Sequence, residues 1–424
     1  MIGDILPVTG VRASVVLNQN ARKDEDIKKE SALLIGSCSY FIMSTAKVFV
    51  GAGFQVDLIS YNKTIKRSRY IPNIFYSSNN HEVIRNFILI NKIEEYRVII
   101  VIDDYILKHL ADAQDIDNEV KLKLLPVISA DYFCHIYSKI GLSEIFRTSG
   151  VNTPQYRVAR DIIHVVRFSE AYGFPLLVKK DSSTGGIGIY ECKNIDDINR
   201  LPNWLFNNPV LVQKKINGII IGIDAYYRDA RLIYYSYSDL CLCNNNDYGP
   251  SSVRTYRQIG VFGDSLYDEL QKIGETLGAN GFANITAIHS AENNLRYYIE
   301  ADMRPTAWIF IGKYIGFDLS DCIRRYYEHG EILGAPLRIN NKFPLSIVLP
   351  LFFRLNSMDI ILNKYNVWKY IYCTGSGYVS IYLSSRIYPY VVTTLEKILP
   401  DYLYLQVKKA YKNVRTGWKL IARS

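Results

Sequence analysis

Short apolar runs alternate with charged segments along the first part of the chain. The runs SALLIG (31–36), FQVDLIS (54–60) and YRVIIVIDD (96–104) have the length of buried strands, and a small-residue turn, GSCSY, follows the first. EVIRNFILINKI (82–93) has helical spacing. Strands that alternate with helices are typical of a parallel sheet with crossover helices. We therefore expect an open α/β domain over residues 1–130, with a ligand crevice at the strand ends.

The middle of the chain has a different pattern. YFCHIYSKIGLSEIFRTSG (132–150) predicts one helix that ends at Gly150, with a proline soon after. Strands, turns and a second helical stretch, DSLYDELQKIGETLGAN (264–280), follow. The zone 236–263 has no regular pattern and predicts a lid, a binding loop or a disordered segment. We expect a second, α+β unit over 131–325, and a tyrosine-rich C-terminal extension over 326–424 that ends in a basic, helix-like tail.

Composition supports a folded chain of two or three units, because 424 residues exceed one core and the chain is 49% hydrophobic and 21% charged. The net charge of +9 suits nucleic acid, an anionic membrane or a polyanionic small molecule. No nucleic-acid-reading motif accompanies it, so we expect no nucleic-acid partner. No apolar run reaches the ~18 residues of a membrane span. The N-terminus lacks the pattern of a secretory signal. The seven cysteines lack a regular spacing, which fits reduced thiols better than a disulfide framework. These features favour a cytoplasmic protein.

The stretch YIEADMRPTAW (298–308) carries the strongest chemical signal. In a strand, Glu300, Asp302 and Arg304 point to one face while Ala301 and Met303 point to the other. Neighbouring carboxylates about 6–7 Å apart can share magnesium ions, and the arginine can hold the phosphate that those ions neutralise. The alternative is a solvated strand face.

Three further segments precede it in the chain. Lys139 lies in the predicted helix before Gly150, where a lysine is usually solvent-facing. Lys179 stands at the end of the apolar strand in FPLLVKK (174–180), and a loop rich in glycine follows. Such a loop is often only a hairpin, but residues without Cβ also let backbone N–H groups close on phosphate oxygens. VLVQKKINGIIIGIDAYY (210–227) predicts a strand, a short linker and a strand.

In this order and spacing the four segments resemble the ATP-grasp superfamily, and within it the branch of biotin carboxylase, carbamoyl phosphate synthetase and the carboxylate–amine ligases. The resemblance covers roughly residues 125–325, and with the preceding domain the first three quarters of the chain. Family members carry a strand that ends in E-x-N-P-R, which here is Glu300-Ala301-Asp302-Met303-Arg304. The resemblance implies a pre-ATP-grasp domain, a two-lobed ATP-grasp domain, ATP and Mg²⁺ as cofactors, and an acyl phosphate that an amine attacks.

The resemblance also implies roles for residues. Glu300 and Asp302 would bind magnesium, and Arg304 would meet the transferred phosphate. Lys139 would reach the phosphates, and Lys179 would close a strand beneath them. Ser182–Gly188 would form a flap over the triphosphate and Gln213–Ile216 the linker beside adenine. The implied nucleotide-binding set is Lys139, Lys179, Ser183, Gly185, Gly186, Gly188, Gln213, Lys214, Lys215, Ile216 and Asp224.

Three positions depart from the family pattern. Lys214 and Ile220 stand where relatives carry glutamates, and an isoleucine cannot accept a hydrogen bond from a ribose hydroxyl. Thr286 stands where relatives place an acid or glutamine, and a neutral hydroxyl is a poor magnesium ligand. Asp302, charged where asparagine is usual, restores one negative charge. These departures leave open a nucleotide-binding protein without turnover, or a regulatory subunit.

The expected substrates are a small-molecule acid and an amine. Arg254 and Arg257 are the candidates for binding the acid's carboxylate, because a guanidinium pairs with it bidentately; an exposed loop pair is the alternative. The basic tail suits a helix packed on the protein, an anionic membrane surface, a subunit contact such as a homodimer, or a carrier-bound acidic substrate. Its residues are Lys408, Lys409, Lys412, Arg415, Lys419 and Arg423, with Tyr402, Tyr404, Tyr411 and Trp418 among them.

Overall fold

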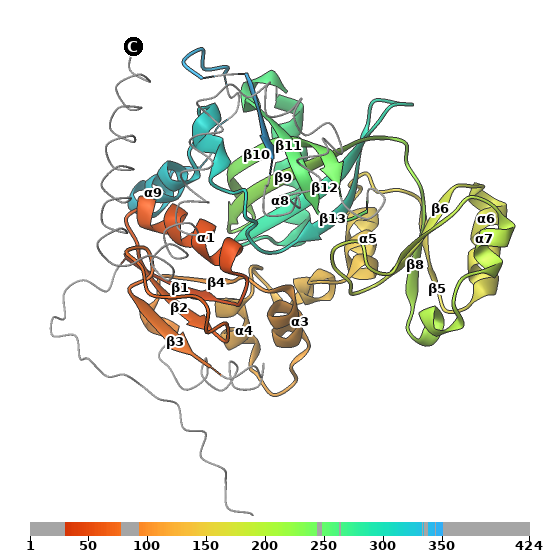
Figure 1. The fold of residues 1–424 in the computed structure, drawn as a ribbon, viewed down its shortest axis with the longest axis horizontal. Coiled ribbons are helices and arrows are strands. Elements are labelled where there is room, and N and C mark those ends of the chain that lie inside the picture. The colour runs from red at the N-terminus through yellow and green to blue at the C-terminus, as the bar shows by residue number, and fades with distance from the viewer. Residues whose placement is uncertain are drawn as a thin grey trace, which may run out of the picture.

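The computed structural model describes residues 30–77, 93–243, 248–262, 264–332, 334, 338–343 and 345–350 (Figure 1). Most of the predicted helix 82–93, most of the C-terminal extension and the whole basic tail lie outside these residues. No helix within the described ranges is long and apolar enough to cross a membrane.

The N-terminal domain is a four-stranded parallel sheet in the order β3-β2-β1-β4. Its strands are β1 (Ser31–Ile35), β2 (Gln55–Ser60), β3 (Asn73–Tyr76) and β4 (Val98–Val101), and its helices include α1 (Ser39–Gly51), α3 (Asp104–Asp112) and α4 (Asn118–Leu124). The three predicted strands are confirmed as β1, β2 and β4, whereas the short β3 was not predicted. Because parallel strands end at one edge, the turn after β1 meets the end of β4: the Ser37 amide donates to Asp103 at 2.8 Å.

The predicted helix over 132–150 is two elements. A 3-10 segment (Ala130–His135) is followed by a break and then by α5 (Lys139–Thr148). Tyr137 in the break has a φ of 53°, and the Ser138 side chain caps α5 by accepting from the Gly141 amide. The single-helix prediction was therefore wrong, because a local N-cap at Ser138 starts a new helix and places Lys139 in its first turn.

Gly141 is expected to tolerate no side chain. A Cβ there would lie 2.0 Å from the carbonyl oxygen of Cys134, because α5 begins directly against the 3-10 segment. The substitution G141A should lower the free energy of unfolding by about 1–3 kcal/mol, measured by urea denaturation. T148A, at the exposed end of α5, is the control, and a loss for G141A as small as the loss for T148A would contradict the close approach.

The central lobe is an antiparallel sheet in the order β5-β8-β6-β7. Its strands are β5 (Tyr156–Ala159), β6 (Leu176–Lys180), β7 (Ile189–Cys192) and β8 (Val210–Lys214). Helices α6 (Ile162–Tyr172) and α7 (Ile195–Asn199) pack on it around a small apolar core of its own. Figure 1 shows this lobe standing apart from the rest of the chain, beyond α5.

The C-terminal lobe is a six-stranded antiparallel sheet in the order β13-β12-β9-β10-β11-β14, with α8 (Asp264–Leu277) against its apolar face. Its strands are β9 (Gly218–Arg228), β10 (Arg231–Cys243), β11 (Ser251–Arg257), β12 (Phe282–Ser290), β13 (Arg296–Asp302) and β14 (Ser346–Pro350). Most of the zone predicted as irregular, 236–263, is the hairpin β10–β11. The prediction failed because buried serines, Ser236, Ser238 and Ser251, interrupt the apolar alternation of these strands.

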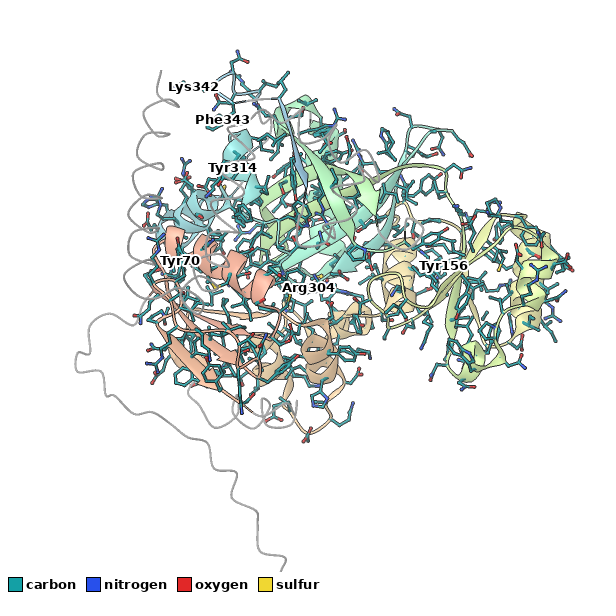
Figure 2. All side chains as sticks on the ribbon, in the orientation of Figure 1. Tyr70, Tyr156, Arg304, Tyr314, Lys342 and Phe343 are labelled. Carbon is teal, nitrogen blue, oxygen red and sulfur yellow. The ribbon has the colours of Figure 1, made fainter. Side chains whose placement is uncertain are left out.

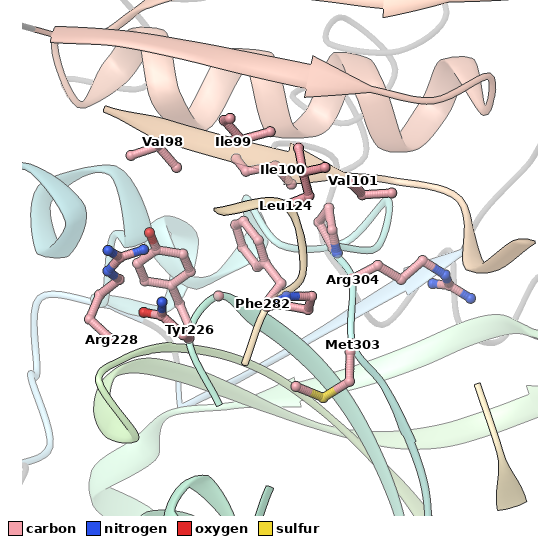
Figure 3. Close-up of a pocket in the computed structure, with 14 residues that line it drawn as sticks. Val98, Ile99, Ile100, Val101, Leu124, Tyr226, Arg228, Phe282, Met303 and Arg304 are labelled. Carbon is pink, nitrogen blue, oxygen red and sulfur yellow. The ribbon is translucent and has the colours of Figure 1, made fainter. Parts of the chain in front are cut away.

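The N-terminal domain packs against this sheet. The Phe49 ring of α1 lies 6.4 Å from the Tyr226 ring and 6.3 Å from the Phe282 ring, and α9 (Leu319–His329) joins the same core. A small cavity of about 20 Å³ remains at this junction, room for about one water molecule. Figure 3 shows β4 residues on one side of it and Tyr226 and Phe282 on the other, with Arg228 and Arg304 at opposite ends. The junction therefore brings the N-terminal domain beside Arg304.

Candidate active site

The end of β13 carries the two predicted metal ligands. Glu300 pairs in register with Thr286, and Asp302 pairs with Asn284, so both carboxylates share one sheet face with these β12 side chains. A bulge between the Glu300 and Tyr298 pairs lets both Ala301 and Tyr298 enter the core. Burial raises the pKa of Glu300 to about 7, with the Asp302 charge also raising it and Lys139 and Lys179 opposing. Burial therefore disfavours the charged form of Glu300, although two lysines stabilise that form.

Arg304 lies just beyond β13, which ends at Asp302, so the prediction that it is a strand residue was wrong. Its side chain nevertheless lies beside the end of β13, where Nη2 donates to Asp302 at 2.9 Å. Nε donates to Asp104 of α3 at 2.8 Å. The guanidinium also lies over the Phe41 ring of α1, at 4.9 Å. Figure 2 shows Arg304 between the N-terminal domain and the C-terminal sheet.

Lys179 comes from the central lobe and is buried at the end of β6. Its Nζ donates to Gln213 Oε1 of β8 at 2.7 Å, while the buried Nε2 of Gln213 has no hydrogen-bond partner. Burial lowers the pKa of Lys179 to about 8; the Glu300 charge raises it and the Lys139 charge lowers it further. The lobes therefore bring Lys179, Lys139 and Glu300 into one electrostatic cluster.

Lys139 holds the start of the predicted flap. Its Nζ donates to the Ser183 carbonyl at 2.8 Å and to the Ser183 hydroxyl at 3.2 Å. Asp181, just before the flap, accepts from the Ile140 amide at 2.8 Å and from the Ser138 hydroxyl. Lys139 is thus directed at the loop and is not a solvent-facing helix residue.

The flap itself depends on glycine. Gly185, Gly186 and Gly188 have φ values of 64°, 79° and 77°, a region that favours glycine. A Cβ on Gly186 would lie 2.6 Å from the carbonyl oxygen of Tyr248, in the turn between β10 and β11. The flap therefore connects β6 and β7 as a hairpin and also touches the opposite lobe.

The linker lysines are engaged with protein groups. Lys214 donates to the Phe174 carbonyl at 2.9 Å, and Lys215 pairs with Glu191 at 2.9 Å. Tyr248 donates to the other Glu191 oxygen at 2.6 Å, so Lys215 and Tyr248 meet on one carboxylate. Ile216, the last predicted linker residue, is half-buried between β8 and β9.

Asp224 and Arg254 form a buried pair on the polar face of the sheet. Arg254 Nη1 lies 3.6 Å from Asp224 Oδ2, and neither atom has a hydrogen-bond partner. Burial raises the pKa of Asp224, with Arg254, Thr306 and Asn284 opposing that rise. The Arg254 guanidinium also lies over the Trp308 ring at 4.7 Å.

Arg257, the second carboxylate candidate, lies apart from Arg254. It is half-exposed and pairs with Asp239 instead. Ile220 lies on the same strand face as Gly222 and Asp224, where it offers no hydrogen-bond acceptor.

Sequence reasoning missed Asp104, Asn284 and Thr306. Thr306 donates to Asp224 at 2.7 Å and Asn284 donates to it at 3.1 Å. Burial raises the pKa of Asp104 to about 6, which Arg304 opposes and Asp302 reinforces. A signal for Asp104 existed, because two acids directly follow the apolar run of β4 at a strand end where ligand crevices form.

The carboxylates of Glu300 and Asp302 fit a magnesium ion whose other ligands come from a nucleotide. Mg²⁺ is usually held by one or two carboxylates together with phosphates and water. Glu300 and Asp302 supply that number, and the described part of the chain holds no group of three or more His, Cys, Asp or Glu arranged for a metal.

The described chain has the ATP-grasp fold, as comparison with solved structures shows. The biotin carboxylase domain dimer of the 2-oxoglutarate carboxylase from Hydrogenobacter thermophilus, in complex with MgADP, ADP and bicarbonate, has a TM-score of 0.58 and 16% identity, covering 73% of this chain and 72% of that one. The N5-carboxyaminoimidazole ribonucleotide synthetase of Thermotoga maritima has a TM-score of 0.53 and 13% identity, over 75% and 79%. The L-amino acid ligase of Bacillus licheniformis has a TM-score of 0.52 and 11% identity, over 70% and 74%.

These comparisons confirm the predicted fold class, an N-terminal α/β domain followed by a two-lobed ATP-grasp unit. No protein-family model matches the chain, and no curated protein matches its sequence.

Proposed function

We propose that this protein is an ATP- and Mg²⁺-dependent carboxylate–amine ligase that works through an acyl phosphate. One observation carries the proposal: Glu300, Asp302 and Arg304 lie together at the end of β13, and Lys139 and Lys179 are close enough for their charges to lower the pKa of Glu300. The structural neighbours are ligases and carboxylases of this kind, and several of them were solved with ADP.

The residues divide the work of binding. Glu300 and Asp302 would hold magnesium, which supplies charge neutralisation of the triphosphate. Lys179, Lys139 and the flap amides would hold phosphate oxygens, and Gln213 beside Lys179 keeps a buried Nε2 without a hydrogen-bond partner. The substrate carboxylate oxygen attacks the γ-phosphorus and ADP leaves. The amine nitrogen then attacks the acyl carbon, loses a proton and displaces phosphate. Positioning and charge stabilisation account for most of such catalysis.

Arg254 is the proposed partner of the acid's carboxylate, because a buried guanidinium with an unpartnered Nη1 has donors to offer. The substitution R254A alone would leave Asp224 as an unpaired buried charge and destabilise the fold by about 3–5 kcal/mol. The double variant D224N/R254M removes both charges and should fold. Compared with D224N alone, which already alters Asp224 of the implied nucleotide-binding set, it should raise the Michaelis constant for the acid at least tenfold while that for ATP changes less than twofold. Equal changes in both constants would remove Arg254 from this role.

The test of the function is phosphate release with ATP, Mg²⁺ and a panel of small acids and amines. Release that needs both an acid and an amine supports the ligase. Ile220 and Thr286 favour one other candidate, a protein that binds nucleotide without turnover. Nucleotide binding without phosphate release for any pair would favour that candidate.

A further inference from the structure

A carboxylate of the N-terminal domain reaches the catalytic arginine. Asp104 is the first residue of α3, directly after the end of β4, and it accepts from Arg304 Nε at 2.8 Å across 200 residues of sequence. Both side chains are close to buried, at 11% exposed for Arg304 and 13% for Asp104. This contact therefore joins two domains inside the site and is not a surface ion pair.

Arg304 is held on three sides. Asp104 accepts a hydrogen bond from Nε, Asp302 accepts one from Nη2, and the Phe41 ring lies against the guanidinium. A guanidinium has five donors, and within the described residues Nη1 makes no hydrogen bond. The contacts thus fix the plane of the group and leave its Nη1 edge for a ligand oxygen.

Asp302 has two uses that compete. In this structure it pairs with Arg304, and under the proposed function it binds magnesium. When Asp302 turns to a metal ion, Arg304 would stay behind as a nearly buried charge, which is unfavourable unless another carboxylate remains. Asp104 is that carboxylate. Its neighbour Asp103 cannot replace it, because Asp103 accepts from the Ser37 amide, the Ser37 hydroxyl and the Tyr61 hydroxyl.

We propose that Asp104 is a positioning residue, which keeps Arg304 paired and oriented and so releases Asp302 to bind magnesium. This inference rests on the proposed function. It also gives the N-terminal domain a part, through Arg304, in the binding of magnesium by the C-terminal lobe.

The test is the Mg²⁺ dependence of nucleotide binding, followed with a fluorescent ADP analogue and needing no acid or amine substrate. In D104N, Asp302 is the one carboxylate among the described residues that still accepts a hydrogen bond from Arg304, so the half-saturating Mg²⁺ concentration should rise about tenfold. Binding of the analogue in EDTA should be unchanged, and D104E, which keeps the charge, should lie between D104N and the wild type. D103N is the matched control: it removes a neighbouring charge but no Arg304 contact, and should shift the midpoint less than twofold.

Repeating the measurement in the D302N variant distinguishes a positioning role of Asp104 from a simple loss of negative charge. If Asp104 acts by releasing Asp302, D104N added to D302N should shift the Mg²⁺ midpoint no further. An unchanged midpoint in D104N, an equal shift in D103N, or a full D104N shift in the D302N background would each overturn the inference. If D104N does not fold, D104E must still require more Mg²⁺ than the wild type. A wild type that binds no nucleotide at any Mg²⁺ concentration would instead overturn the proposed function itself.

Discussion

Replacing Glu300 by glutamine is expected to abolish Mg²⁺-dependent phosphate release and, in the same protein, to raise the free energy of unfolding at pH 8. Activity should fall about 100-fold or more, because an amide oxygen replaces one of the two carboxylates that we propose as magnesium ligands. Without magnesium the charged carboxylate of Glu300 destabilises the folded state, since burial and Asp302 raise its pKa to about 7. The gain in the free energy of unfolding should be about 1–3 kcal/mol.

The sign of the pH dependence follows from that shift. An acid whose folded pKa is raised destabilises the folded state most at pH values above about 7 and not at all below its unfolded value. E300Q should therefore exceed the wild type by its full margin at pH 8, and the margin should shrink as the pH falls towards 5. Urea denaturation without magnesium measures this, with E292Q on an exposed turn as the control. Equal stabilities at pH 8 would contradict the burial of Glu300.

Replacing Lys179 by methionine is expected to give the second large effect, with the opposite pH dependence. Nucleotide affinity should fall about 10- to 100-fold, the loss typical of a charge-assisted contact to phosphate. Burial lowers the pKa of Lys179 to about 8, so protonation of this side chain destabilises the fold at neutral pH. K179M should thus be more stable than the wild type at pH 7, by about 1–3 kcal/mol.

That advantage should disappear as the pH rises. A base whose folded pKa is lowered destabilises the folded state fully below about 8 and not at all above its unfolded value. Urea denaturation at pH 7 and pH 10 measures the difference, and K193M on the exposed surface is the control. A margin that grows between pH 7 and pH 10 would contradict the assignment of Lys179 as a buried cation in the cluster.

E300Q and K179M together test whether Glu300 and Lys179 influence each other's pKa. Glu300 raises the pKa of Lys179, and Lys179 lowers that of Glu300, so each substitution should also alter the titration of the other group. In E300Q the pKa of Lys179 should fall further below its ordinary value.

The sequence alone determined several of the local elements and the order of the chemical segments. Apolar runs of strand length predicted β1, β2 and β4, and the spacing of Glu300 and Asp302 placed both on one face of β13, because strand periodicity is a local property. The glycines of the flap, and Lys179 one residue before the end of β6, were also evident from composition and position. These features need no knowledge of distant neighbours.

Only the tertiary structure decided which polar groups meet. It brought Asp104 to Arg304, paired Asp224 with Arg254, separated Arg257 from both, and directed Lys139 to Ser183. It also showed that buried serines, not a loop, explain the irregular pattern of β10 and β11. Periodicity states which face of a strand a side chain occupies, but the partner on that face depends on how sheets and domains pack, and packing joins residues that lie far apart in the chain.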